Sequence, residues 1–214
     1  MLKEINQITD TIYLGNVEAA FDIPKLKKLG IRKILTVMSA FGNHYSENAF
    51  IHKTIDIDDD YESNIICYFK ECLLFMDGYD KVFVHCAAGM SRSATIVVAY
   101  LMWKRKLSLN EAIKFVKNKR PVISPNLNFM RQLEIFEELL KKKNYDLNKI
   151  NFKKIKIKDD KCKIFWWILS IYIIYKSCVV IIIYQCLKKY FVYYFKFIIK
   201  NGQNLINKIF ILID

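Results

Sequence analysis

The segment of residues 81–103 constrains the fold more than any other part of the chain. Residues 81–84 form a short apolar run, typical of a buried strand, that leads directly into His85 and Cys86. Residues 93–103 are apolar on most sides, which predicts a buried central helix. A strand, a glycine-containing loop and a helix in this order gather backbone N–H groups into an anion-binding cradle. The loop is therefore expected to carry the chemistry.

The remainder of the first 143 residues alternates strand-like and helix-like patterns. Alternation of this kind predicts an α/β domain with a central, mainly parallel sheet flanked by helices. A domain of residues 1–143 is expected from this pattern. Further strands are predicted at 11–16, 31–38 and 52–57, an acidic loop at 56–60, and helices at 17–29, 64–76, 109–119 and 126–142.

Composition excludes several classes of protein. With 6 glycines and 3 prolines in 214 residues, and 53% of residues hydrophobic, the chain fits neither a disordered nor a fibrous protein. The six cysteines are irregularly spaced, so no disulfide framework and no metal site are expected. The polar N-terminus lacks the apolar core of a secretory signal. These features favour a catalytic domain in the reducing cytoplasm or nucleus that requires no cofactor.

The C-terminal third differs in composition. Residues 145–214 carry 13 basic and 4 acidic side chains, which is +9 of the net charge of +13. Residues 144–163 are predicted to be a basic linker, and residues 164–214 a hydrophobic, basic, helical tail. The 24-residue run 164–187, interrupted only by Lys176, is long enough for a membrane anchor. The alternative is an extension that a correct gene model would lack. The apolar run makes a membrane the expected partner of this charge, and not nucleic acid.

Cys86 has the surroundings of a nucleophile. A thiol reacts as its thiolate, which is favoured at a helix N-terminus and beside a cation. The backbone of Ala87, Ala88, Gly89, Met90 and Ser91 forms the predicted cradle. Arg92 adds a planar fork of donors that can hold two oxygens of a phosphoryl group, which lysine would do poorly.

Three neighbours are expected to assist. The Ser93 hydroxyl is placed to hydrogen-bond the thiolate, and Ser91 to support the loop backbone. His85 points to the opposite side of the chain and is expected to orient the loop through hydrogen bonds. A His85–Cys86 catalytic dyad is the less favoured alternative.

The segment His-Cys-x-x-Gly-x-Ser-Arg-Ser at residues 85–93 resembles the signature loop of the protein tyrosine phosphatase superfamily. Three other blocks, at residues 13–16, 99–102 and 124–126, resemble the dual-specificity branch in the right order. The resemblance covers about residues 5–142. With no docking domain before it and no zinc module after it, the chain is similar to the small atypical members.

The resemblance also implies an acid that protonates the leaving oxygen, supplied by an aspartate on a separate loop. The acidic loop offers Asp56, Asp58, Asp59 and Asp60, and the acid of the family aligns with Asp59. A solvated turn without chemistry is the alternative for this cluster. Asn126 is expected to tie its loop to the cysteine loop. Ser93 would make the thiolate a better leaving group when the phosphocysteine is hydrolysed.

The expected function is hydrolysis of phosphotyrosine and phosphoserine or phosphothreonine in proteins through a phosphocysteine intermediate. The loop lacks the lysines by which lipid phosphatases of the superfamily hold inositol phosphates, so phosphorylated proteins are the expected partners. Two alternatives remain: a pseudophosphatase that binds phosphoproteins without turnover, and a membrane-tethered interaction module. Cys86, Arg92 and Asp59 are all present, which argues against the first.

Overall fold

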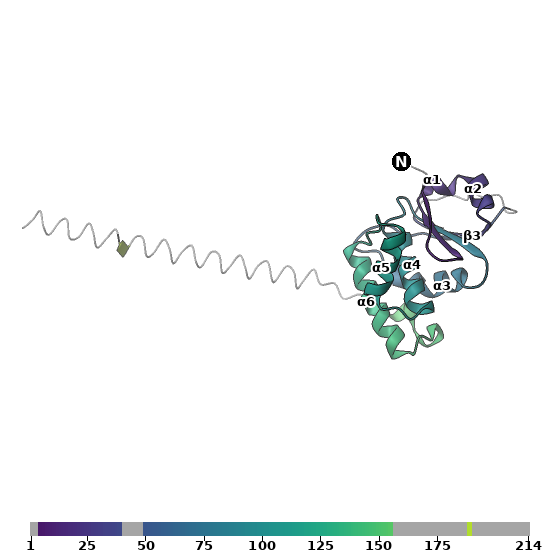
Figure 1. The fold of residues 1–214 in the computed structure, drawn as a ribbon. Coiled ribbons are helices and arrows are strands. Elements are labelled where there is room, and N and C mark those ends of the chain that lie inside the picture. The colour runs from purple at the N-terminus through teal and green to yellow at the C-terminus, as the bar shows by residue number, and fades with distance from the viewer. Residues whose placement is uncertain (1–3, 40–48, 156–187, 190–214) are drawn as a thin grey trace, which may run out of the picture. The chain divides into compact units, whose positions relative to one another are not determined.

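The computed structural model describes residues 4–39, 49–155 and 188–189. Two units are distinguished, Met1–Ile157 and Lys158–Asp214, and every element described below belongs to the first (Figure 1). The strands are β1 (Ile5–Gln7), β2 (Ile12–Gly15), β3 (Ile31–Val37), β4 (Ile51–Ile55) and β5 (Lys81–His85). The α-helices are α1 (Val17–Ala20), α2 (Ile23–Lys28), α3 (Phe69–Met76), α4 (Arg92–Lys104), α5 (Leu109–Lys119) and α6 (Leu127–Lys142). Short 3-10 turns are η1 (Ile65–Tyr68), η2 (Leu147–Lys149) and η3 (Phe152–Lys154).

The five strands form one sheet in the order β1-β2-β5-β3-β4. The pairs β2–β5, β5–β3 and β3–β4 are parallel, and only β1 runs antiparallel to its neighbour. The predicted central sheet flanked by helices is confirmed. β5 lies in the middle of the sheet, so the loop that follows it opens at the carboxyl end of the parallel strands. Ligands of open α/β sheets commonly bind at this end.

The side chains of the strands alternate between two apolar layers, and helices cover each face of the sheet. Tyr13, Ile34 and Phe83 pack on one face of the sheet with residues of α1 and α2. Leu14 and Val84 point to the other face, where α3, α4, α5 and α6 cover the sheet. The two-residue period of a strand thus gives the sheet its two covered faces.

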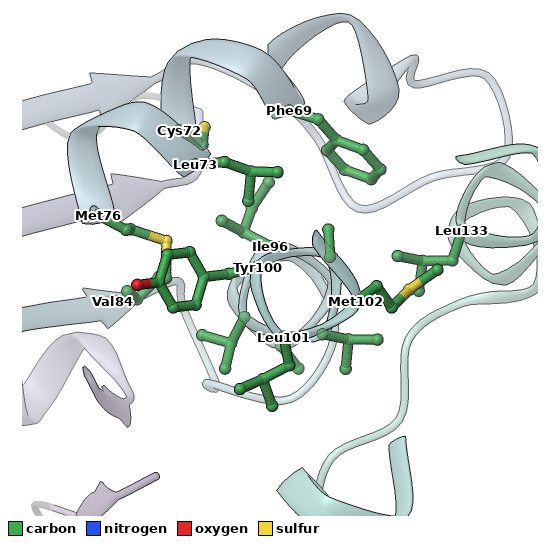
Figure 2. Packing of buried hydrophobic residues seen from close by; sticks show 14 of the residues in the cluster. Phe69, Cys72, Leu73, Met76, Val84, Ile96, Tyr100, Leu101, Met102 and Leu133 are labelled. Atoms are coloured by element: carbon green, nitrogen blue, oxygen red, sulfur yellow. The ribbon is translucent and has the colours of Figure 1, made fainter. Parts of the chain in front are cut away.

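Helix α4 is the centre of the larger layer (Figure 2). All ten residues from Ser93 to Met102 are buried, so the helix has no solvated stripe along most of its length. Its apolar side chains pack with those of α3, β5 and α6; in Figure 2, Ile96 lies towards Leu73 of α3 and Met102 towards Leu133 of α6. Contacts on every side hold the first turn of α4, and therefore the end of the loop, in place.

Three local features differ from the sequence-based expectations. The three-residue strand β1 was not predicted, because it is too short to show a period. The helix expected at 17–29 is two helices, since Asp22 caps α2 through its side chain and Pro24 occupies the first turn. The helix expected from residue 64 begins as the tighter turn η1 before α3.

Part of the predicted basic linker, 144–163, is packed and not solvated. Leu147, Ile150 and Phe152 are 4–5% exposed and join the larger core. These apolar residues alternate with lysines and asparagines, so the composition of the segment predicts a solvated linker. Residues 156–163 and the run 164–187 lie outside the described residues. Among residues 4–39, 49–155 and 188–189, no helix has the length and apolar character needed to cross a bilayer.

Candidate active site

The cysteine loop, residues 86–92, turns its carbonyl groups away from its centre. Each carbonyl of residues 87–91 accepts a hydrogen bond from elsewhere in the protein. Because C=O and N–H point in opposite directions across a trans peptide, the N–H groups of residues 88–92 face the other way. The loop is thus a cradle of donors held from outside. The bonds are Val17 N–H to Ala87 O (3.0 Å), Arg120 Nη2 to Ala88 O (3.3 Å), Arg120 Nε to Gly89 O (2.8 Å), Ser124 N–H to Met90 O (2.9 Å) and Thr95 N–H to Ser91 O (2.9 Å).

Gly89 is the residue around which the loop turns. Its φ of +67° lies in the left-handed region, where a Cβ is disfavoured. A Cβ added there would also lie 2.3 Å from the carbonyl oxygen of Gly15 at the end of β2. Gly15 also has no room for a Cβ, which would lie 2.5 Å from the carbonyl oxygen of Glu4 and 2.8 Å from the Phe83 ring.

Cys86 lies at the floor of the cradle, and its side chain is almost completely buried. Its Sγ accepts hydrogen bonds from the Gly89 N–H at 3.2 Å and from the Ser93 hydroxyl at 3.1 Å. Ser93 is in the first turn of α4, whose N-terminus points at the loop and favours negative charge there. Both donors favour the thiolate over the thiol. The contact expected of Ser93 is present.

Arg92 is held on the side of the loop towards the acidic loop, residues 56–60. Its Nη1 donates to the carbonyl of Ile57 at 3.1 Å, and its Nε lies 3.6 Å from Oδ2 of Asp59. The guanidinium is thereby placed as a planar, permanently charged group at the mouth of the cradle. A bound phosphoryl group would receive donors from the backbone and from this fork together.

Asp59 is the aspartate of the acidic loop that faces the cysteine loop. Its Oδ1 accepts from the Ser91 hydroxyl at 2.7 Å and from Asn126 Nδ2 at 2.8 Å. The neighbouring carboxylates are engaged elsewhere. Asp58 accepts from the Ser39 hydroxyl. Asp60 accepts from Ser63 and from the N–H of residue 62, and these hydrogen bonds lower its pKa.

Asn126 joins three structural parts. Its side-chain oxygen caps α6 by accepting from the N–H of Phe129 at 2.8 Å. Its Nδ2 donates to Asp59, and its own N–H donates to the Ser91 hydroxyl at 3.2 Å. Ser91 therefore receives one bond from Asn126 and donates another to Asp59. These contacts join α6, the acidic loop and the cysteine loop.

His85 lies behind the nucleophile. Its Nε2 is 2.7 Å from the hydroxyl of Thr36, which is 3.0 Å from Nε2 of His52. Burial lowers the pKa of His85 to about 4, so the ring is neutral near pH 7. A neutral ring stacked on that of Phe83, two residues earlier in β5, is suited to orient the loop.

The other described thiols have different surroundings. Cys72 is buried in the larger core, and burial raises its pKa. Burial also raises the pKa of Cys67, whose Sγ lies 3.6 Å from the carbonyl of Phe152. Both favour the unreactive thiol form. Among the described cysteines, Cys86 alone lies against several backbone and hydroxyl donors.

Two residues at this site were not predicted from the sequence. Arg120 ends α5 among lysines 117 and 119, where a solvated cation at a helix C-terminus is the ordinary interpretation. Instead it is buried behind the cysteine loop. Thr36, in β3, gave no sequence signal at all, because its partners His52 and His85 come from other strands. The position of Arg120 directly before Pro121 was the one local sign that the helix ends there.

Comparisons with known proteins show what the chain is similar to in sequence and in structure. Residues 12–139 match the family model described as dual specificity phosphatase, catalytic domain. Human dual specificity protein phosphatase 9 is 44% identical over 140 residues, which are 63% of this chain and 36% of that protein. Dual specificity protein phosphatase 1 of Arabidopsis thaliana is 42% identical over 135 residues, which are 61% of this chain and 68% of that protein.

A solved structure gives the same result for the fold. The human tyrosine phosphatase-like serine/threonine/tyrosine-interacting protein superposes with a TM-score of 0.62 at 31% identity. The match covers 65% of this chain and 99% of that one. Against several curated relatives, however, this chain spans only about a third of their length.

Proposed function

Because this chain belongs to the dual specificity phosphatase family, we propose that it hydrolyses phosphate monoesters of tyrosine and of serine or threonine in proteins. The match of residues 12–139 to the family model confirms the resemblance to the dual-specificity branch that the sequence indicates. The roles of individual residues are part of the proposal, and they follow from the geometry of the cradle.

In the first step Cys86 is the nucleophile. Its thiolate attacks the phosphorus, so that an S–P bond forms while the bond from phosphorus to the leaving oxygen breaks. Asp59, in its protonated form, gives its proton to that oxygen. Arg92 and the N–H groups of residues 88–92 bind the three remaining oxygens, whose charge they stabilise in the transition state.

In the second step water attacks the phosphorus of the phosphocysteine. Asp59, now a carboxylate, takes a proton from this water, and the S–P bond breaks. Inorganic phosphate leaves and the thiolate of Cys86 returns. Ser93 assists this step because its hydroxyl already donates to Sγ and stabilises the leaving thiolate.

The observation that carries the proposal is the environment of the Cys86 sulfur. It lies at the floor of a loop whose carbonyls all point outward, and it accepts one backbone and one hydroxyl hydrogen bond. A structural cysteine packed in an apolar core has no use for such donors. A nucleophile that must remain a thiolate does.

The test uses the full chain under reducing conditions with a chelator present. We expect hydrolysis of p-nitrophenyl phosphate and of matched phosphotyrosine and phosphothreonine peptides, and a phosphorylated Cys86 peptide after rapid acid quench. Cys86→Ser should reduce turnover to background, while Cys67→Ser should retain it. Turnover that persists in Cys86→Ser would exclude this mechanism.

An inert wild-type protein that still binds the phosphopeptides would favour the pseudophosphatase alternative. The presence of Cys86, Arg92 and Asp59 argues against it. A cytoplasmic or nuclear location is part of the same proposal, because the thiolate is lost when Cys86 is oxidised.

A further inference from the structure

Behind the cysteine loop lies a second arginine, Arg120, whose side chain is 2% exposed. Its guanidinium makes contacts on two sides. Towards the loop, Nε donates to Gly89 O at 2.8 Å and Nη2 to Ala88 O at 3.3 Å. Away from the loop, Nη1 donates to Asn6 Oδ1 at 2.6 Å and lies 3.3 Å from Glu4 Oε2. A charged fork is thus fixed between the start of the sheet and the loop.

The two carbonyls belong to consecutive peptide planes. The plane that carries Ala88 O also carries the N–H of Gly89, and the plane that carries Gly89 O also carries the N–H of Met90. Within each plane C=O and N–H point in opposite directions. A donor that holds the oxygen on the outer side of the loop therefore turns the N–H towards the centre of the cradle. The Gly89 N–H indeed points at Sγ of Cys86, at 3.2 Å. One side chain therefore orients two donors of the cradle.

The other carbonyls of the loop are held differently. Those of Ala87 and Met90 accept from backbone N–H groups, and that of Ser91 accepts from Thr95 in the first turn of α4. These donors are backbone N–H groups and the hydroxyl of Thr95, which carry no net charge. Arg120 adds a full positive charge in a buried position, where screening by water is weak.

We propose that Arg120 is a positioning residue of the phosphatase reaction, which orients the Gly89 and Met90 N–H groups towards the thiolate and the phosphoryl oxygens of the transition state. Asn6 and Glu4 hold its far side. Because the side chain is buried behind the loop, it acts through these two peptide groups and not by contact with the substrate. The proposal rests on the proposed phosphatase function, which it deepens.

The variants separate charge from geometry. Arg120→Met removes both, whereas Arg120→Lys keeps a charge but cannot hold two carbonyls with a planar fork. Arg32→Met, at an exposed position of β3, is the control for the same change in net charge. Asn6→Ala loosens the fork from behind and serves where Arg120→Met does not fold.

Kinetics of the full chain give the first measurement. We expect kcat for p-nitrophenyl phosphate to fall about 10- to 100-fold in Arg120→Met, the range for loss of oriented backbone donors, with KM within about threefold. Arg120→Lys should recover only part of kcat, and Asn6→Ala should lower kcat by less than Arg120→Met. Circular dichroism and urea unfolding establish the folded fraction of each variant.

Alkylation of Cys86 gives the second measurement, and it needs no turnover. Trypsin releases residues 82–92, a peptide in which Cys86 is the single cysteine, so iodoacetamide labelling can be followed by mass spectrometry. The charged and titratable groups facing the loop are Arg92, Asp59, His85 and Arg120. Burial lowers the pKa of His85 to about 4, so His85 does not titrate between pH 5 and 10.

We expect the rate constant of labelling at pH 7 to fall in Arg120→Met, where the Gly89 N–H is no longer held towards Sγ, and to be unchanged in Arg32→Met. A kcat and a labelling rate constant in folded Arg120→Met that equal those of Arg32→Met would overturn the proposal. A kcat loss fully recovered in Arg120→Lys would reduce the role of Arg120 to its charge and also overturn it. If wild type is inert, the phosphatase function fails, yet the labelling rate constants still decide whether Arg120 positions the loop.

Discussion

The cysteine loop and the acidic loop meet at one site but are built in opposite ways. Cys86, Gly89 and Ser91 of the cysteine loop are buried, and backbone carbonyls and a glycine without room for a Cβ determine the shape of the loop. The acidic loop is mostly exposed, and the side chains of Asp58, Asp59 and Asp60 determine its contacts. To bind a phosphoryl group, the cysteine loop must orient several backbone N–H groups, so its backbone must be fixed. The acidic loop has to position only one carboxyl group, which side-chain hydrogen bonds can do. The difference predicts unequal responses to mutation.

The largest effect is expected at Gly89 in the cysteine loop. Gly89→Ala would combine a left-handed φ of +67°, which costs about 1–2 kcal/mol, with backbone overlap against Gly15. Relieving that overlap moves the loop, and a displacement of about 1 Å costs about 100-fold in rate. Urea unfolding and p-nitrophenyl phosphate hydrolysis would measure both losses.

Gly30 provides a control that separates the cost of a positive φ from the cost of steric overlap. Gly30 has a φ of +74°, but an added Cβ there would meet only the end of the Lys81 side chain, at 3.7 Å. Gly30 follows α2 and precedes β3, at the end of the sheet opposite the site. Gly30→Ala should cost about 1 kcal/mol of unfolding free energy and leave kcat unchanged. Equal kcat losses in the two variants would show that overlap at the loop is unimportant.

The buried His85 next to the cysteine loop predicts that the stability of the fold depends on pH. An unfolded histidine binds a proton near pH 6.5, whereas burial lowers the pKa of folded His85 to about 4. Between these values the unfolded state binds more protons, so acid favours unfolding. The contribution of His85 to the unfolding free energy should fall by about 3 kcal/mol as the pH drops from 6.5 to 4.

Urea unfolding at several pH values would test this dependence. His85→Gln should have lower stability than wild type at pH 7 but a smaller loss on acidification. The half-buried His52, whose pKa is also lowered by burial, gives the control His52→Gln, for which a smaller change of slope is expected. An acid-induced loss in His85→Gln as large as in wild type would contradict the assignment.

In the acidic loop, substitutions are expected to lower activity without unfolding the protein. Asp59→Asn should leave the fold intact and lower kcat by about 100-fold, the usual contribution of a positioned general acid. The loss should be larger for phenyl phosphate than for p-nitrophenyl phosphate, because p-nitrophenolate leaves more easily without a proton. Asp58→Asn, whose carboxylate contacts Ser39 instead, is the matched control and should lose much less. Equal losses would mean that the acid is wrongly assigned.

The two loops also differ in how far sequence alone reveals them. The strand, loop and helix at 81–103 are contiguous, and their apolar periods predict β5, Cys86 and α4 directly. Asp59 was selected from four aspartates by family resemblance. Its contacts with Ser91 and Asn126 join residues 32 and 67 positions apart, and no local pattern encodes them.

The parts of the fold that were missed have local explanations. Arg120 resembles an ordinary helix-ending cation until the loop is folded against it. The strand β1 is three residues long, and its pairing with β2 is a tertiary contact. Phe152 and its apolar neighbours lie among lysines, so a linker was expected where the chain packs onto η1 and α6.

The smallest effect is expected at Asn126, which belongs to neither loop but contacts both. Asn126→Ala removes the cap of α6, at a cost of about 1 kcal/mol of unfolding free energy, and also the donor to Asp59. Ser108→Ala removes the cap of α5 at a similar cost, without any contact to the site. Only Asn126→Ala should slow turnover, by up to about tenfold, since one hydrogen bond to a charged group contributes about 1.5 kcal/mol or more. If both variants keep the wild-type kcat, Ser91 and Arg92 suffice to hold the acid, and the link from α6 matters only for stability.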